Sequence, residues 1–384
     1  MFAARGGFVN AAVSGTPQWY NMTTTQISNE VATWVSTGTR TLSNSVALGN
    51  VIWSTNDAYR AAVAFPTNGN VYMCPSAKGA NTILEIDPRT LSAREVNTNL
   101  NLRAVSTNNF VGGCLGDDGK IYWPPYDHNK VLVADPANSS YSLQDWGISL
   151  STKKYFTAVA ANNKVYAIGQ TDMLVIDTAA NTAFTSTYGV LSGTTANRHI
   201  AGVRSIKDGN VYFGPYANTH YLRMDITANV LSSNTYGQPA ISQNTQGAAN
   251  GKNGNVYFTN YLTSSGRSIR VLDPASNTMS NLALNSAVRS IGGCMGPDGN
   301  VYAAFQASGN STFIDVTTGN VVAGPSYLPG TTARGGMLFV NNKLLTVPSA
   351  NTNTHITITT VPGTGDSGDF SANIQLSSFM NMEG

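Results

Sequence analysis

The sequence predicts an all-β fold built from seven copies of one short unit. Each copy has an apolar strand after a polar turn, as in "GGCMGPDGNVYAAF" at residues 292–305 and "GGCLGDDGKIYWPP" at residues 112–125. One position of that strand recurs at intervals of 43 to 50 residues; it is held by Tyr72, Tyr122, Tyr166, Tyr212, Tyr257, Tyr302 and, in the seventh copy, Leu345. Self-similarity at this period indicates a repeat architecture.

Each unit holds about four strands. Its apolar runs are short and rich in Val, Ile and Tyr, and Gly, Asn and Asp bound them. The order is a strand of small residues, the turn, the tyrosine strand, a strand such as "VLVAD" at residues 131–135 and a looser polar strand such as "SYSLQDW" at residues 140–146. Four strands at this period are typical of a propeller blade, so we predict a seven-bladed β-propeller of four-stranded antiparallel blades.

Local chemistry explains why certain residue types recur at fixed positions of each unit. The first strand, rich in Gly and Ala, is expected to be innermost, where the blades crowd around the channel. Asp-Gly pairs such as Asp298-Gly299 favour a tight two-residue turn, because glycine accepts positive φ. An aspartate ends the third strand at Asp87, Asp135, Asp177, Asp225, Asp273 and Asp315. We expect each to accept a backbone N–H two residues on, as a structural Asx-turn and not as a catalytic group.

These units resemble those of the YVTN, NHL and lactonase-like seven-bladed propellers, over roughly residues 58 to 378. The resemblance implies the fold, but it implies no one activity, because propellers carry enzymes, lectins and scaffolds alike. Two shorter phrases, "MFAARGGF" at residues 1–8 and "LPGTTARGGMLF" at residues 328–339, resemble propeller-bearing bacteriophage tail or baseplate proteins.

Composition narrows the classes of partner. Charged residues make up 11% of the chain, against about 25% in an average domain, and the net charge is +2. The surface is therefore expected to be neutral and polar, which suits sugars or lasting contact with neighbours and disfavours nucleic acid. We expect no membrane span, because no run of eighteen apolar residues occurs, and no secretion signal. The three cysteines have no paired or metal-ligand spacing and are expected to be buried small hydrophobes.

The chain divides at about residue 57. Residues 58–384 carry the propeller, and residues 1–57 do not fit the repeat. Two interpretations of this segment stay open. It supplies a strand that completes the last blade, or it is an assembly arm that docks through the aromatic residues Phe2, Phe8, Trp19 and Trp34. A C-terminal stretch, residues 374–379, offers another outer strand for the last blade.

The channel mouth is the expected contact surface. The start of each inner strand and the loop after each tyrosine strand should share one face. Arg60, Lys154, Arg289 and Arg334 lie near the starts of four inner strands, where they either bind an anion or pair with loop carboxylates. Tyr126, Tyr216 and Tyr261 follow the repeat tyrosine by four residues and either stack on sugars and partners or pack the loops.

We find no sign of an enzyme. His128, His199, His220 and His355 do not recur at one repeat position, and no nucleophile elbow, metal-binding helix or phosphate loop is visible. No cofactor or metal is expected. The leading hypothesis is a non-enzymatic virion protein of a phage tail or baseplate, assembled in the host cytoplasm into an oligomer with other virion proteins, and mediating attachment to the host surface. The alternatives are a soluble lectin-like propeller that binds a cell-surface glycan and a lactonase- or lyase-like enzyme.

Overall fold

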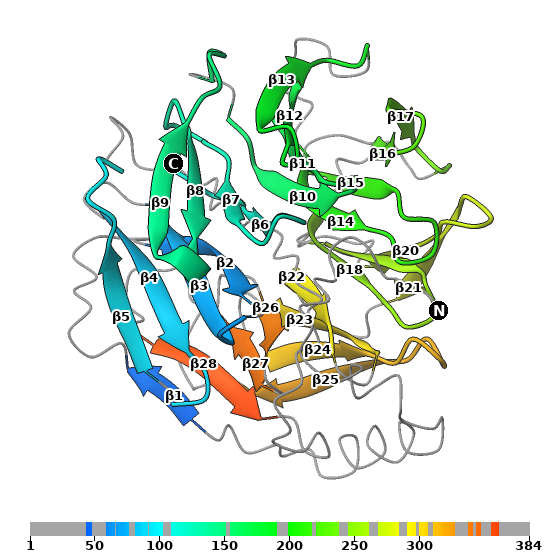
Figure 1. Ribbon diagram of the computed structural model, residues 1–384. Coiled ribbons are helices and arrows are strands. Elements are labelled where there is room, and N and C mark those ends of the chain that lie inside the picture. Colours follow the sequence, from blue (N-terminus) through cyan, green and yellow to red (C-terminus); the bar gives the residue numbers. More distant parts are fainter. Residues whose placement is uncertain are drawn as a thin grey trace.

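A computed structural model shows β-sheets arranged around a central axis (Figure 1). It describes residues 44–47, 59–65, 67–76, 81–90, 92–102, 109–150, 154–189, 199–216, 220–237, 245–260, 268–283, 290–296, 299–305, 310–326, 337–340, 343–346 and 355–360. The described strands form seven four-stranded antiparallel sheets, numbered here in chain order.

The first sheet holds β2 (Tyr59–Phe65), β3 (Asn70–Pro75), β4 (Thr82–Asp87) and β5 (Ser92–Asn97). The second holds β6 (Cys114–Leu115), β7 (Ile121–Trp123), β8 (Val131–Asp135) and β9 (Ser140–Gln144). The third holds β10 (Thr157–Ala161), β11 (Lys164–Ile168), β12 (Met173–Asp177) and β13 (Thr182–Ser186). The fourth holds β14 (His199–Arg204), β15 (Val211–Pro215), β16 (Tyr221–Asp225) and β17 (Val230–Asn234).

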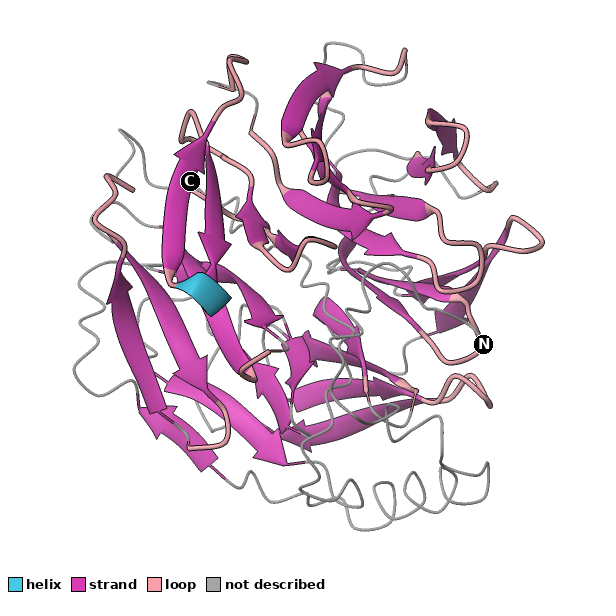
Figure 2. Cartoon of the chain, viewed as in Figure 1, coloured by secondary structure: helices cyan, strands magenta, loops and turns pink. Residues whose placement is uncertain are grey.

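The fifth sheet holds β18 (Thr245–Asn250), β19 (Val256–Asn260), β20 (Ser268–Asp273) and β21 (Thr278–Ala283). The sixth holds β22 (Ser290–Met295), β23 (Val301–Phe305), β24 (Asn310–Ile314) and β25 (Val321–Ser326). The seventh holds β26 (Met337–Val340), β27 (Lys343–Thr346), β28 (His355–Thr360) and β1 (Asn44–Ala47). Among the described residues the one helical element is a 3₁₀ turn, Pro136–Asn138, in the β8–β9 hairpin (Figure 2).

The first strands of the sheets form the inner ring, as predicted. Each contacts the first strand of the next sheet, and β26 contacts β2, so the sheets close into a β-propeller. Their small residues are needed there. A Cβ on Gly247 would collide with the backbone of Gly292 in the neighbouring sheet, and one on Gly202 would lie 2.8 Å from Cγ2 of Val159. The all-β prediction is confirmed.

The seventh sheet joins distant parts of the chain. Its outer strand, β1, pairs antiparallel with β28, with Asn44 opposite Ile358 and Ala47 opposite His355. Part of the N-terminal segment therefore closes the ring. The C-terminal stretch that offered another outer strand, residues 374–379, lies outside the described residues.

The repeat tyrosine and the turn form one unit. Tyr122 donates its hydroxyl to Oδ2 of Asp118 at 2.8 Å, and Tyr212 does the same to Asp208 at 2.7 Å. The expected two-residue turn is wrong at these sites. Around Asp118 the loop closes from Gly116 N to the Lys120 carbonyl oxygen at 2.7 Å and holds three residues, whereas around Asp208 it closes from Ser205 N to the Asn210 carbonyl oxygen at 2.8 Å and holds four. In the three-residue loop, Asp118 accepts the Lys120 N–H in addition to the Tyr122 hydroxyl. Gly119, which follows Asp118, has positive φ.

The aspartates after the third strands are structural, as predicted. Oδ1 of Asp87, Asp177, Asp225, Asp273 and Asp315 accepts the backbone N–H two residues on, at 2.9 to 3.1 Å. Asp135 instead caps the 3₁₀ turn Pro136–Asn138 and accepts the backbone N–H of Asn138, three residues on, at 3.3 Å. These bonds hold the β-hairpins between the third and fourth strands.

Apolar side chains fill the spaces between neighbouring sheets and make the core. One such cluster joins Val131 and Val133 of the second sheet to Leu174 and Ile176 of the third. All three cysteines, Cys74, Cys114 and Cys294, are buried, and no disulfide joins them. Within the described residues, no helix is long and apolar enough to cross a bilayer.

Candidate functional site

The inner strands share one direction around the ring, so their starts gather at one face, called the mouth face below. The loop after the second strand of each sheet reaches the same face. Tyr155, just before β10, donates its N–H to the carbonyl oxygen of Pro125, in the loop after β7, at 3.0 Å. The expected meeting of these two kinds of segment therefore occurs between the second and third sheets.

Apolar side chains from three neighbouring sheets meet at this face. The mouth cluster consists of Val111, Tyr126, Phe156, Ile200 and Tyr216. The rings of Tyr126 and Phe156 meet edge to face, with their centroids 5.4 Å apart. Tyr126 is only 6% exposed, whereas Tyr216 is partly exposed at the edge of the cluster. The predicted residues Tyr126 and Tyr216 thus share one cluster, but Tyr126 is mainly a packing residue and Tyr216 is the one that faces solvent.

The basic residue of the mouth has partners within the chain. Lys154 places Nζ 4.7 Å from the ring centroid of Tyr126 and 3.3 Å from Oδ1 of Asp127. This is the pairing with a loop carboxylate that the sequence left open. The lysine stays 36% exposed, so its ammonium group remains in contact with solvent.

Several predicted residues are not placed. Arg60 lies in β2, opposite Cys74, but its side chain is outside the description. Tyr261, Arg289 and Arg334 lie outside the described residues altogether, as do the proposed arm residues Phe2, Phe8, Trp19 and Trp34. Their roles as anion, partner or docking contacts stay predictions.

Two histidines of the described part have structural roles. His128 stacks on Phe110 with 5.2 Å between ring centroids, and its Nδ1 accepts the Lys130 N–H at 3.0 Å. Burial lowers the pKa of His128 and so favours its neutral form. His199 is 1% exposed, with Nε2 2.8 Å from the backbone oxygen of His220. Among the described residues, no three or more His, Cys, Asp and Glu side chains group to hold a metal ion.

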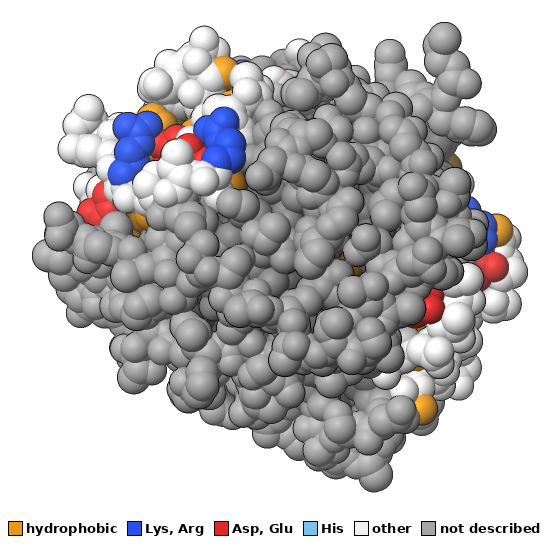
Figure 3. Space-filling view, turned by 90° about the horizontal axis from the view of Figure 1, so that it is seen from below, with side chains coloured by type: hydrophobic (Ala, Val, Ile, Leu, Met, Phe, Trp, Pro, Cys, Tyr) orange, Lys and Arg blue, Asp and Glu red, His pale blue; other side chains and the backbone are white. Residues whose placement is uncertain are grey.

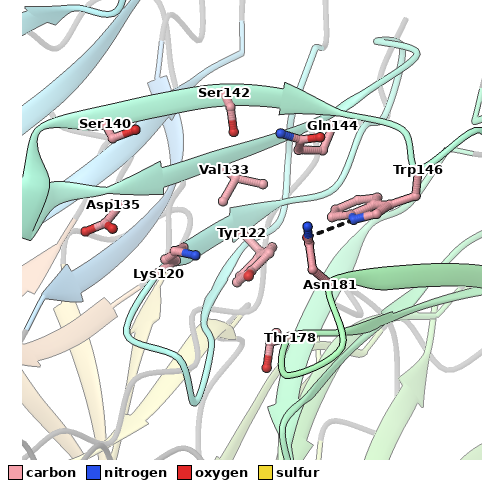
Figure 4. Close-up of a pocket in the computed structure, with 10 residues that line it drawn as sticks. All are labelled: Lys120, Tyr122, Val133, Asp135, Ser140, Ser142, Gln144, Trp146, Thr178 and Asn181. Carbon is pink, nitrogen blue, oxygen red and sulfur yellow. Dashed lines mark hydrogen bonds between the residues drawn. The ribbon is translucent and has the colours of Figure 1, made fainter.

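A second site, which the sequence analysis missed, lies away from the mouth. A cavity of about 390 Å³ separates the second sheet from the β12–β13 hairpin of the third, and we call it the outer groove (Figure 4). Its walls include Ser142 and Gln144 of β9, Lys120, Trp146 and Asn181. The indole Nε1 of Trp146 donates to Oδ1 of Asn181 at 3.1 Å and bridges the two sheets.

The hydrogen bond from Trp146 to Asn181 has counterparts between other neighbouring sheets. Tyr188 donates to Asn229 at 3.2 Å and Tyr236 donates to Asn277 at 3.1 Å, each across the next pair of sheets. We call these aromatic–asparagine contacts clasps. The signal in the sequence is an aromatic-Gly pair after the fourth strand, in which both residues have positive φ; the pairs are Trp146-Gly147, Tyr188-Gly189 and Tyr236-Gly237. Aligning the fourth strands would have found it.

Charge on the described surface is mixed in sign. Figure 3 shows Lys and Arg side chains beside Asp and Glu side chains. The ion pairs agree with this view: Lys207 lies 2.6 Å from Asp273, and Lys130 lies 3.0 Å from Asp145. Such pairs leave no broad field of one sign on this part of the surface to attract a polyanion.

Comparison with known proteins supports the fold. No protein-family model matches the chain, and no curated protein matches it. Among solved structures, streptogramin B lyase is similar with a TM-score of 0.65 at 12% identity, over 82% of this chain and 96% of the other. A catalytically inactive virginiamycin B lyase from Staphylococcus aureus with quinupristin gives 0.65 at 11% identity, over 82% and 97%. The β-propeller domain of Myceliophteria thermophila Cps50 gives 0.57 at 12%, over 83% and 98%. Identities this low show the fold alone.

Proposed function

We propose that the chain is a non-catalytic binding propeller of a virus particle, a structural protein of a bacteriophage tail or baseplate. In this role the mouth face contacts another virion protein, and the N-terminal segment before β1 adds a second contact. The particle is assembled in the host cytoplasm. Attachment to the host surface is a further role of the same assembled protein.

The mouth cluster carries this proposal. It brings aromatic and aliphatic side chains from three sheets to one face and leaves Tyr216 partly exposed at its edge. Lys154 provides an exposed cation beside it. An aromatic group backed by a packed cluster and flanked by polar groups has the composition of an energetically important protein contact. The sequences at residues 1–8 and 328–339, which resemble segments of phage tail or baseplate proteins, are the reason for proposing a phage tail or baseplate.

The histidines favour binding over catalysis. A general acid or base has to reach a substrate with a ring nitrogen. His128 and His199 instead use the nitrogens described above on backbone groups, inside the packed protein. Streptogramin B lyase shares the fold at 12% identity, so its activity is the enzymatic alternative to exclude. Incubation of the purified chain with quinupristin is expected to leave the compound intact by mass spectrometry. Turnover would replace the proposal with an enzymatic function.

Particle incorporation tests the proposal directly. Phage particles are purified on a density gradient from cells that express wild-type protein, Tyr216→Ala or the control Val230→Ala, and the protein is quantified by immunoblot. We expect the wild type and the control in the particle fraction and at least a tenfold loss of Tyr216→Ala, because an anchoring aromatic contributes about 2 kcal/mol or more to a contact. Val230 is an exposed residue of an outer strand, 54% accessible, and is not part of the mouth cluster. Absence of the wild type from particles would contradict the proposal.

A further inference from the structure

We infer that the outer groove is a binding site for a neutral pyranose sugar. The inference goes beyond the proposed assembly role, because the groove lies along the outer strands of the second sheet and not at the mouth face. Its volume of about 390 Å³ falls within the range of about 300–1,000 Å³ that is usual for small-molecule sites.

The groove exists because of two small residues in the repeat. In the second sheet, Tyr122 lies opposite Val133, and Val133 lies opposite Ser142. The same register in the first sheet holds Glu85 and Arg94, whose side chains form an ion pair at 2.6 Å. Charged side chains thus occupy, in the first sheet, the place that Val133 and Ser142 leave open in the second.

Other sheets fill the corresponding place in different ways. In the third sheet, Phe184 stands in the place of Ser142. In the fourth sheet, Arg223 stands in the place of Val133 and pairs with Asp225 at 3.4 Å. The fifth sheet keeps a valine and a serine, but Leu282 replaces Gln144 and packs against an apolar cluster that includes Val316. The second sheet therefore combines an open groove with polar walls.

The walls offer unused hydrogen-bonding groups. Ser140, Ser142 and Gln144 alternate along β9, so their side chains lie on one side of the strand (Figure 4). Within the described part of the chain, these three side chains make no hydrogen bond. Two hydroxyls and an amide can both donate and accept, which matches the hydroxyl groups of a sugar.

An aromatic surface of fixed orientation completes the site. The clasp to Asn181 holds the Trp146 indole at the end of the groove, and Trp146 is only partly buried. An indole face packs well against the apolar C–H face of a pyranose ring while hydroxyls bond to the polar wall. Lys120 and Asp135 bring one charge of each sign to the lining, so the site favours a neutral ligand over an ion.

Binding of simple sugars tests the inference. The full chain is titrated with the methyl pyranosides of glucose, galactose, mannose, N-acetylglucosamine and rhamnose, each up to about 20 mM, and binding is followed by saturation-transfer NMR. We expect at least one to bind with a Kd of about 1 mM, which is typical of a small polar ligand. If none of the five binds, the inference is overturned.

Variants that introduce the residues of other sheets into the groove test whether the sugar binds there. Val133→Glu with Ser142→Arg reproduces the pair of the first sheet, and Ser142→Phe reproduces the residue of the third, so both changes have a folded precedent in the same chain. Each should weaken sugar binding at least tenfold, whereas Ser232→Phe, in the fourth sheet, should not. Val133 belongs to the core cluster, so the double variant is expected to lose stability, and Ser142→Phe, at a partly buried position, is the variant expected to keep the wild-type melting temperature. Binding that survives both groove variants overturns the inference. Particle incorporation of the same variants should stay at the wild-type level, so the two proposals can fail separately.

Discussion

Tyr188 donates its hydroxyl to Oδ1 of Asn229 at 3.2 Å, and so ties the end of the third sheet to the β16–β17 hairpin of the fourth. Both residues have positive φ, 49° for Tyr188 and 54° for Asn229. Few side chains adopt this conformation, but asparagine does so readily, and glycine follows the tyrosine. The conformation therefore suits Asn229, whereas Tyr188 adopts one that is uncommon for an aromatic residue.

Removal of this clasp should destabilise the propeller slightly. Tyr188→Phe keeps the ring and loses the hydrogen bond, so we expect the free energy of unfolding to fall by about 0.5 to 1 kcal/mol in urea denaturation. Tyr141→Phe is the matched control, because Tyr141 is also partly buried and makes no side-chain hydrogen bond within the described residues. An equal loss in both variants would show that the clasp adds nothing.

Two truncations should separate ring closure from docking. Deletion of residues 1–50 removes β1 and exposes the edge of β28, so the melting temperature should fall by several degrees. Deletion of residues 1–40 keeps β1 and should leave the melting temperature unchanged while it lowers particle incorporation. Thermal denaturation of both proteins checks the first point. If the shorter deletion lowers the melting temperature as much as the longer one, the segment before β1 is part of the fold and not an arm.

The two tyrosines of the mouth should respond differently to truncation. Tyr126→Ala removes a ring that is 6% exposed and packs on Phe156, so we expect a loss of about 3 kcal/mol in the free energy of unfolding. Tyr216→Ala, at the edge, should cost less than about 1 kcal/mol. Chemical denaturation measures both. Equal costs would mean that Tyr216 is a packing residue and not an available contact.

Acid should weaken an ion pair between the fourth and fifth sheets. The Lys207 ammonium, together with the Ala275 N–H, lowers the pKa of Asp273 to about 2. Because the folded pKa is below that of the unfolded chain, near 3.8, this stabilisation is present above about pH 4 and is lost as the pH falls toward 2. Lys207→Met should therefore reduce the loss of stability between pH 5 and pH 3.

A neighbouring lysine provides the control for the acid experiment. Lys252 packs on Gly299 of the next turn, as Lys207 packs on Gly254, but it forms no ion pair within the described residues. Lys252→Met should keep the wild-type pH dependence. Identical pH profiles for Lys207→Met and the wild type would show that the ion pair has no effect on stability in acid.

The fold follows from the sequence because its signals are local and repeated. Tyr122 and Tyr212 each donate to an aspartate four residues earlier, and Tyr72 and Tyr257 each accept from an asparagine at the same spacing, so one pattern predicted several strands. The turn length was wrong because that same aspartate bonds to the tyrosine and to a backbone N–H, which a two-residue turn does not allow.

The sites were harder to predict because they depend on contacts between units. Tyr126 and Tyr216 lie in one cluster, but Tyr126 is buried against Phe156 of the neighbouring sheet, a contact that the spacing of residues within one unit does not reveal. The outer groove arises from what Val133 and Ser142 lack in comparison with Glu85 and Arg94. The repeat pattern identifies residues that the units share, whereas the groove results from residues in which the second sheet differs from the first.

Crosslinking mass spectrometry of purified phage particles tests the proposed contact most directly. Lys154 lies at the mouth face and Lys207 in the β14–β15 turn at the opposite face, and their side chains are 36% and 33% exposed, so the two report on the two faces with similar accessibility. We predict crosslinks from Lys154 to another virion protein and a marked loss of them in Tyr216→Ala. Crosslinks to virion proteins only from Lys207, or from neither lysine, would contradict a contact through the mouth face.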